Sequence, residues 1–266
     1  MFVVNVATGS FDPIPNTDAL TNERSVAWLD NSTLLISGGT VYTLGASSLQ
    51  TLPGAGGIEA VVRGDTLFYL SMGGSYPTIT ATLSRYSLSG RHVLNSISLG
   101  SFQLPQGRSP GDFHFQGWDA SPDGSHVVYQ VTAAGPAGDS QLEGIASSHI
   151  FYANADGSGQ RAILQYMTTT NAVRIRFSPN GTQVAVTEAE PLPDIITGCV
   201  NSSGASGDPC FHSYALPSGQ YSANYPAWAA DGHTFLVESN GNLYRFTMGA
   251  SSGALAQANA TNPWTV

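Results

Sequence analysis

Lysine is absent from this sequence of 266 residues, so all nine basic side chains are arginines. Charged residues make up only 10% of the chain, well below the roughly 25% usual in soluble domains, and the formal net charge is -9. A surface of this charge repels phosphate backbones. We therefore expect no nucleic-acid partner.

Long hydrophobic runs are missing as well. Nowhere do about 18 apolar residues follow one another, and the N-terminal stretch MFVVNVATGSFDPIP has no basic segment ahead of an apolar one. These residues therefore contain neither a predicted membrane span nor a predicted secretion signal. A membrane anchor outside them stays open.

Cysteine is scarce, with two residues in the whole chain. Cys199 and Cys210 flank VNSSGASGDP, a Gly/Ser/Pro stretch without a helical period. A disulfide there would stabilise the fold by roughly 2 to 3 kcal/mol through loop closure. We favour this pairing over two free thiols, and it implies an oxidising, extracytoplasmic location, whether secreted, periplasmic or on the cell surface.

Turn-forming residues are plentiful, and they recur in a pattern. Each repeated segment has an aromatic or small residue, a tight polar turn and then an apolar strand. The segments are VAWLDNSTLLIS (26–37), WDASPDGSHVVYQ (118–130), IRFSPNGTQVAVT (175–187), PAWAADGHTFLVES (226–239) and, with a poorer turn, AVVRGDTLFYLS (60–71). Asp-Gly and Asn-Gly pairs supply the positive φ of a tight hairpin turn. We predict that each segment is an inner β-hairpin.

A second pair of predicted strands follows each of these hairpins. These pairs are VYTLGASSLQTL (41–52), LSRYSLSGRHVL (83–94), HIFYANADGSGQRAIL (149–164), HSYALPSGQY (212–221) and NLYRFTMGASSGAL (242–255). Two hairpins in series make a four-stranded antiparallel unit. Five such units predict an all-β chain folded as a β-propeller of four-stranded blades.

The turn sequences carry a family resemblance. Ser121-Pro122-Asp123-Gly124 and Ser178-Pro179-Asn180-Gly181, each before an apolar strand, and the YANADG segment of 152–157 resemble the TolB-like (WD40-like) β-propeller family. The resemblance covers nearly the whole chain and implies a single propeller domain over residues 1–266. It says little about function, since propellers serve both as binding proteins and as enzymes.

The two ends of the chain bear on the number of blades. MFVVNVATGSFDPIP has the pattern of a second hairpin, and TNPWTV (261–266) resembles the start of an inner strand. Together they would form a sixth, incomplete blade from both termini. A fragment of a longer chain is the other interpretation, and we favour it.

Loop lengths predict where a partner binds. Antiparallel order puts the turns within hairpins on one face and the connections between hairpins on the other. The long segments 12–24, 100–115, 132–148 and 188–210 are all expected on the second face. We predict that a protein or peptide partner binds to this long-loop face.

Candidate site residues are few, and each has a simpler structural interpretation. Glu188, Glu190 and Asp112 could offer oxygen ligands to Ca²⁺, but in no recognisable ligand spacing, and the metal, if any, is unknown. His114, beside Asp112, has no second histidine at metal-ligand spacing. Arg174 and Arg176 alternate on a predicted inner strand and could bind a carboxylate, or pair with a neighbouring blade.

No serine can be tied to a histidine and an aspartate by a recognisable sequence context. We therefore predict a non-enzymatic extracytoplasmic propeller that acts as a protein- or peptide-binding scaffold or sensor domain, without a cofactor unless Ca²⁺ binds. The alternative is a TolB-like hydrolase or lyase with a metal or small ligand in the central channel.

Overall fold

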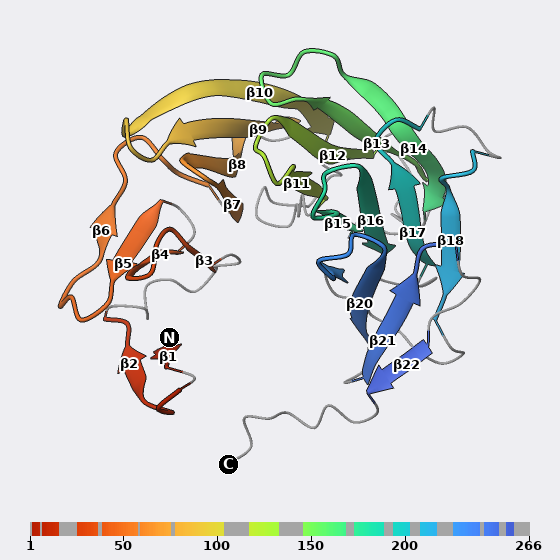
Figure 1. The fold of residues 1–266 in the computed structure, drawn as a ribbon. Coiled ribbons are helices and arrows are strands. Elements are labelled where there is room, and N and C mark those ends of the chain that lie inside the picture. Colours follow the sequence, from red (N-terminus) through yellow and green to blue (C-terminus); the bar gives the residue numbers. More distant parts are fainter. Residues whose placement is uncertain are drawn as a thin grey trace. The chain divides into compact units, whose positions relative to one another are not determined.

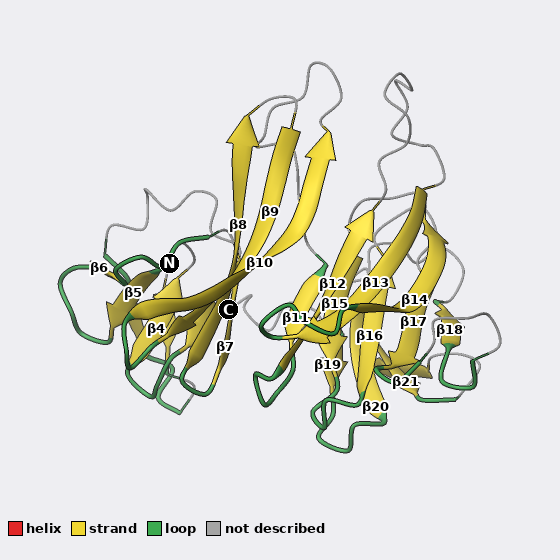
Figure 2. Ribbon diagram, turned by 90° about the horizontal axis from the view of Figure 1, so that it is seen from above, coloured by secondary structure: helices red, strands yellow, loops and turns green. Residues whose placement is uncertain are grey.

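The computed structural model describes most of the chain. The described residues are 2–5, 7–15, 26–36, 39–57, 59–75, 78–103, 117–132, 146–168, 173–188, 194–202, 208–216, 226–239, 242–249 and 254–257. Within these ranges every regular element is a β-strand, and there is no helix able to cross a membrane. The all-β prediction is confirmed (Figures 1 and 2).

The strands form one hairpin and five four-stranded antiparallel sheets, each in meander order. The hairpin comprises β1 (Phe2–Val4) and β2 (Phe11–Pro13). Blade I has β3 (Val26–Trp28), β4 (Thr33–Ile36), β5 (Thr40–Thr43) and β6 (Gln50–Thr51). Blade II has β7 (Glu59–Arg63), β8 (Thr66–Ser75), β9 (Thr78–Ser87) and β10 (His92–Gln103).

Three further blades follow. Blade III has β11 (Trp118–Ala120), β12 (His126–Thr132), β13 (Ala146–Asn154) and β14 (Arg161–Thr168). Blade IV has β15 (Val173–Phe177), β16 (Gln183–Glu188), β17 (Asp194–Cys199) and β18 (His212–Ala215). Blade V has β19 (Ala227–Trp228), β20 (Thr234–Ser239), β21 (Asn242–Thr247) and β22 (Ala254–Gln257). All five predicted inner hairpins are present, and the fold has the blade arrangement of a β-propeller.

The predicted turn chemistry is confirmed. Gly124, Gly181 and Gly232 have φ of 70°, 71° and 67°, in the region that favours glycine. Each of these residues donates its N–H to a carbonyl three residues earlier, which closes the turn between the first two strands of its blade.

The chain divides into two compact units. The first contains residues 1–74 and 80–100, and the second contains residues 75–79 and 101–266. In the first unit β3 lies beside β7, so the innermost strands of blades I and II are neighbours. Apolar side chains between these blades form its main core, including Leu35, Val41, Leu67, Tyr69 and Tyr86.

The N-terminal hairpin packs on blade I by one face only. Val3 packs against the cluster of Ile14, Leu34, Ile36 and Tyr42, and the Tyr42 hydroxyl donates to Asp12 over 2.8 Å. The opposite face of the hairpin carries Phe2, Val4 and Phe11, whose exposed fractions are 62%, 41% and 69%. Trp28, at the end of β3 in blade I, is half exposed.

The second unit has two cores, one on each side of blade IV. Between blades III and IV lie Val128, Ile150, Ile163, Leu164, Ile175, Phe177, Val184, Val186, Ile196 and Val200. Between blades IV and V lie Ile195, Tyr214, Leu216, Phe235, Val237, Tyr244 and Phe246. β11 lies beside β15, which repeats the innermost-strand arrangement of the first unit.

Blade IV corrects one prediction. Residues 188–210 are not a single long loop, because β17 runs through them and pairs with β16 and β18. HSYALPSGQY is accordingly not a hairpin: HSYA is the fourth strand of the blade, and its partner is β17. Adjacent Ile195 and Ile196 point into opposite cores, so this strand lacks the alternation of a half-buried one.

Gly198 also made β17 difficult to predict from the sequence. A Cβ atom on Gly198 would lie 2.6 Å from Cδ2 of the buried Leu164, so glycine is required by the close approach of blade III. The composition of this stretch therefore resembles that of a loop.

The disulfide is present between Cys199 and Cys210, with the Cα atoms 5.4 Å apart. It closes the turn between β17 and β18, and antiparallel order puts this turn at the same end as the S-P-D-G and S-P-N-G turns. The prediction that the cysteines belong to the opposite, long-loop face is wrong. The other predicted long loops are 12–24, 100–115 and 132–148, and most of their residues lie outside the described ranges.

Candidate functional site

The two Ser-Pro turns of blades III and IV are held by their own side chains. In blade III the Ser121 hydroxyl donates to Asp123 Oδ1 over 2.6 Å, and the same oxygen accepts the Ser125 N–H at 3.0 Å. In blade IV the Ser178 hydroxyl donates to Asn180 Oδ1 over 2.7 Å. Either an aspartate or an asparagine can form this turn, because the Ser hydroxyl needs only one side-chain oxygen as its acceptor.

Turns of successive blades lie close together at this end of the second unit. A Cβ atom on Gly181 would lie 3.6 Å from Cδ of Pro122, and one on Gly232 would lie 3.0 Å from Nδ2 of Asn180. Gly232 therefore has a steric as well as a conformational reason to be glycine. The result is a rigid row of three turns, one from each of blades III, IV and V.

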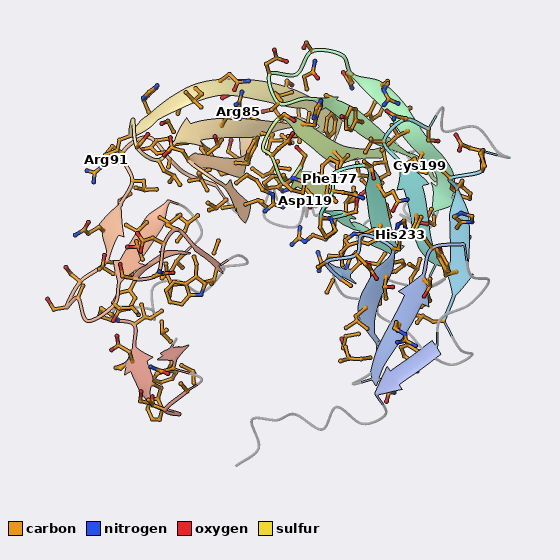
Figure 3. All side chains as sticks on the ribbon, in the orientation of Figure 1. Arg85, Arg91, Asp119, Phe177, Cys199 and His233 are labelled. Carbon is orange, nitrogen blue, oxygen red and sulfur yellow. A yellow bond between two sulfur atoms is a disulfide. The ribbon has the colours of Figure 1, made fainter. Side chains whose placement is uncertain are left out.

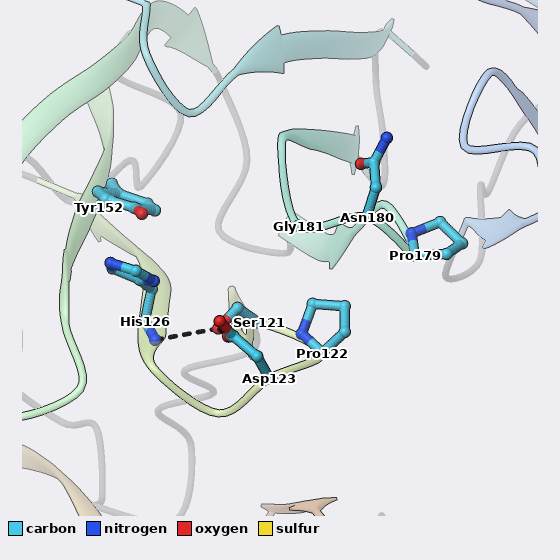
Figure 4. Close-up of a pocket in the computed structure, with 8 residues that line it drawn as sticks. All are labelled: Ser121, Pro122, Asp123, His126, Tyr152, Pro179, Asn180 and Gly181. Atoms are coloured by element: carbon cyan, nitrogen blue, oxygen red, sulfur yellow. Dashed lines mark hydrogen bonds between the residues drawn. The ribbon is translucent and has the colours of Figure 1, made fainter.

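A pocket of about 240 Å³ opens between the first two turns of this row (Figure 4). We call it the turn pocket. Its lining comprises Ser121, Pro122, Asp123, His126, Tyr152, Pro179, Asn180 and Gly181. The His126 ring stacks on the Tyr152 ring, with centroids 4.9 Å apart and an interplanar angle of 18°. The pocket thus combines a carboxylate, an amide and an aromatic wall.

The disulfide turn is attached to the wall of this pocket through Arg161. The Arg161 guanidinium lies 5.0 Å from the centroid of the Tyr152 ring, and it donates to the carbonyl oxygens of Ser202, at 3.0 Å, and Val200. The Val200 N–H in turn donates to the Thr182 carbonyl over 2.9 Å. Blade III and the disulfide turn of blade IV are therefore tied together beside the pocket.

The carboxylate of the turn pocket is ionised over the whole physiological pH range. Hydrogen bonds from the Ser121 hydroxyl, and then from the Ser125 hydroxyl and N–H, lower the pKa of Asp123 from 3.8 to about 2. Burial raises the pKa of the Tyr152 phenol, which therefore stays protonated. In blade V, backbone hydrogen bonds from His233 and Thr234 lower the pKa of Asp231.

A buried carboxylate joins the innermost strands of blades III and IV. Asp119 is 1% exposed, and its Oδ2 accepts the Phe177 N–H at 2.9 Å (Figure 3). Its Oδ1 lies 3.7 Å from Nη1 of Arg176. The innermost strands of blades IV and V are also joined by a hydrogen bond. The Trp228 indole N–H donates to the Arg176 carbonyl over 3.2 Å.

Three of the six predicted site residues, Arg174, Arg176 and Glu188, lie on β15 and β16 of blade IV. Arg176 pairs with Asp119 on the neighbouring blade, and Arg174 lies two residues before it on β15. Glu188 ends β16, where its backbone pairs with Val173. Asp112, His114 and Glu190 lie outside the described residues. Ligand binding by these six residues stays a prediction.

Sequence analysis missed the residues that line the turn pocket, because it assigned the Ser-Pro turns to the fold alone. A signal was present: His126 and Tyr152 are aromatic residues on the adjacent strands β12 and β13 of one blade, next to turns whose polar side chains repeat. Among the described residues no group of three or more His, Cys, Asp or Glu could hold a metal ion.

Comparison with known proteins gives structural likenesses only. No family model and no curated protein matches the chain. It is similar to an oligogalacturonate lyase in complex with manganese (15% identity, TM-score 0.48, 81% of this chain and 59% of that chain). It is also similar to the β-propeller domain of the trilobed protease from Pyrococcus furiosus (10% identity, TM-score 0.47, 76% and 57%). The chain thus spans less than three fifths of either protein.

Proposed function

We propose that this chain is a non-enzymatic, protein- or peptide-binding domain of the TolB-like propeller type. The turn pocket is the observation that carries the proposal. Its polar groups are fixed before binding by hydrogen bonds within the turns, and such preorganisation lowers the entropy lost on association. An ionised carboxylate, an amide and an aromatic wall on rigid turns suit recognition of a polar side chain.

The proposed location is extracytoplasmic, and the disulfide supports it, because such bonds persist mainly in oxidising compartments. Alkylation of free thiols before purification from the cells that make the protein, followed by mass analysis, tests it. Unmodified Cys199 and Cys210 are expected. Two alkylated cysteines would place the protein in a reducing compartment.

We further propose a single propeller domain of six blades. The N-terminal hairpin would be the outer half of the sixth blade, and the segment 261–266 would contribute an inner strand to it. The exposed apolar face of the hairpin supports this arrangement. Soluble proteins rarely leave a large apolar patch uncovered, so another strand is expected to pack on this face.

Site-specific photocrosslinking tests the binding function. A photoreactive amino acid replaces Pro122 at the rim of the turn pocket, with Ser213, exposed on β18, as the matched control position. A second position within residues 132–148 samples the predicted long-loop face, which stays a prediction. We expect a specific protein adduct from position 122 or from the long-loop position, and none from position 213.

The same purified protein also tests the enzyme alternative. A metal bound in stoichiometric amount, together with turnover of a small substrate and no protein adduct at either face, would overturn the binding function. That result would favour the hydrolase or lyase with a ligand in its channel. Adducts at Ser213 in equal yield would show that the crosslinks are nonspecific.

A further inference from the structure

We propose that the turn pocket binds the cationic side chain of a basic peptide segment in the partner, with Asp123 as its counter-ion. This inference rests on the proposed binding function and adds the chemistry of the ligand. Three observations support it: the charge of the pocket, the unused hydrogen-bonding capacity of its groups, and the occupied faces of its aromatic wall.

The charge of the pocket comes from Asp123. Its serine partners are neutral, so their hydrogen bonds hold the carboxylate in place without cancelling its charge. The nearest arginine described on this wall, Arg161, already donates to the carbonyl oxygens of Val200 and Ser202. The local field therefore attracts cations.

Hydrogen-bonding capacity is left over for a ligand. Among the described residues, Asp123 Oδ1 accepts from Ser121 and Ser125, while Oδ2 accepts only from the Ser125 hydroxyl, at 2.7 Å. An ionised carboxylate offers about four lone-pair sites, so Oδ2 can accept a further N–H. Figure 4 shows the Tyr152 hydroxyl directed toward the pocket, where it can serve as a second acceptor.

The aromatic wall favours a side chain over a flat ring as the ligand. The Tyr152 ring is stacked on His126, and the Arg161 guanidinium also lies over it. The ring faces are therefore used within the protein, which leaves the ring edge and the hydroxyl to the pocket. A sugar or a nucleobase would need an open ring face to stack on. A guanidinium or ammonium group needs only the acceptors.

The turn itself allows the charge to be moved without loss of structure. Asn180 makes the same side-chain hydrogen bonds in blade IV as Asp123 makes in blade III, from a Ser hydroxyl and from a backbone N–H. Asp123→Asn therefore removes the charge and keeps the turn. Asn180→Asp adds a charge to the same pocket in the same way, and the double variant transfers the charge from one turn to the other.

The test is a titration of the whole chain with blocked tripeptides, monitored by NMR. The probes are acetyl-Gly-X-Gly-amide, with X as arginine, lysine, the neutral isostere citrulline, or glutamate. We expect the arginine and lysine peptides to shift the resonances of residues 121–126 and 152. Asp123→Asn should weaken this binding about three- to tenfold, and Asn180→Asp should strengthen it by a similar factor. Asp231→Asn, in a turn that does not line the pocket, is the control and should change nothing.

Several results would overturn the inference. These are equal binding of the citrulline and arginine peptides, binding of the glutamate peptide instead, or unchanged affinity in Asp123→Asn. The photocrosslinking experiment separates this failure from that of the proposed function. A partner captured equally by the wild type and by Asp123→Asn leaves the binding function standing and removes only the cationic ligand. Tripeptide binding that depends on Asp123, without any partner adduct, supports the site and contradicts the wider function.

Discussion

Asp119 is the residue on which the junction between blades III and IV depends most directly. One carboxylate serves the Phe177 N–H and the Arg176 guanidinium at once, and it is itself almost completely buried. Removal of this group leaves the buried Phe177 N–H without its acceptor and takes a counter-charge away from the partly buried Arg176, which costs more than the net value of the bonds.

We expect Asp119→Ala to lower the free energy of unfolding by about 3 kcal/mol, the lower end of the range for a broken buried pair, since solvent reaches part of Arg176. Asp119→Asn is the matched variant: it can keep an oxygen for the Phe177 N–H, but it loses the charge and the second oxygen, which accepts the Ala120 N–H. It should cost about half as much. Urea unfolding measures both, and a change in Asp119→Ala within about 0.5 kcal/mol, as at ordinary surface positions, would contradict the assignment.

Asp123 should make the stability of the protein depend on pH, because its pKa is lower in the folded protein than in the unfolded chain. Its contribution to stability is complete above the unfolded value of 3.8 and is lost as the pH falls through about 2. The wild type should therefore melt at a higher temperature than Asp123→Asn above pH 4, and the two should converge near pH 2. The carboxylate is exposed, so the difference will be small. A difference in melting temperature between the wild type and Asp123→Asn that stays the same at every pH would contradict the lowered pKa of Asp123.

At the scale of the element, β17 shows where prediction from sequence failed and why. Inner strands with Ser-Pro-Asp-Gly turns could be predicted, because a local turn signal and an alternating strand stand next to each other. β17 has neither: apolar residues enter cores on both of its faces, and Gly198 is there for Leu164 of another blade. That reason for glycine is a contact between residues 34 positions apart, which a local pattern does not contain.

A double-mutant cycle tests this account of Gly198. We expect Gly198→Ala to cost about 1 to 3 kcal/mol, the usual cost of overpacking, because its Cβ meets Leu164, which is fully buried. In a Leu164→Ala background the same substitution should cost much less, since the methyl group enters the space vacated. Additive costs in urea unfolding would mean that Gly198 is required for another reason, such as the adjacent disulfide turn.

At the scale of the whole molecule, the sequence predicted the repeat but not the site. Five blades follow from the spacing of the turns, and the disulfide from two cysteines around a loop-like stretch. The turn pocket was not predicted, because it forms only where turns 57 residues apart in the chain, at Asp123 and Asn180, lie side by side. The contact of Arg161 with the disulfide turn arises in the same way, from the packing of two blades.

The N-terminal hairpin gives the last prediction. Register places Val4 opposite Phe11 and Phe2 opposite Pro13, so these side chains share the exposed face, while Asp12 holds the other face to Tyr42. If the segment 261–266 completes the proposed sixth blade, its deletion uncovers this face. We expect the truncated chain to bind the dye ANS more strongly and to melt lower, by about 2 to 4 °C for each kcal/mol lost.

A matched variant makes this result specific. In a chain with Phe2→Thr, Val4→Thr and Phe11→Thr, the three exposed apolar side chains are replaced by threonine, which also favours strands. The deletion should then no longer raise ANS fluorescence, because the apolar face is gone while the backbone pairing remains. Equal ANS binding by the full and truncated chains would mean that the face is open in both. The strand that covers it would then come from outside these 266 residues, which is the outcome expected of a fragment of a longer propeller.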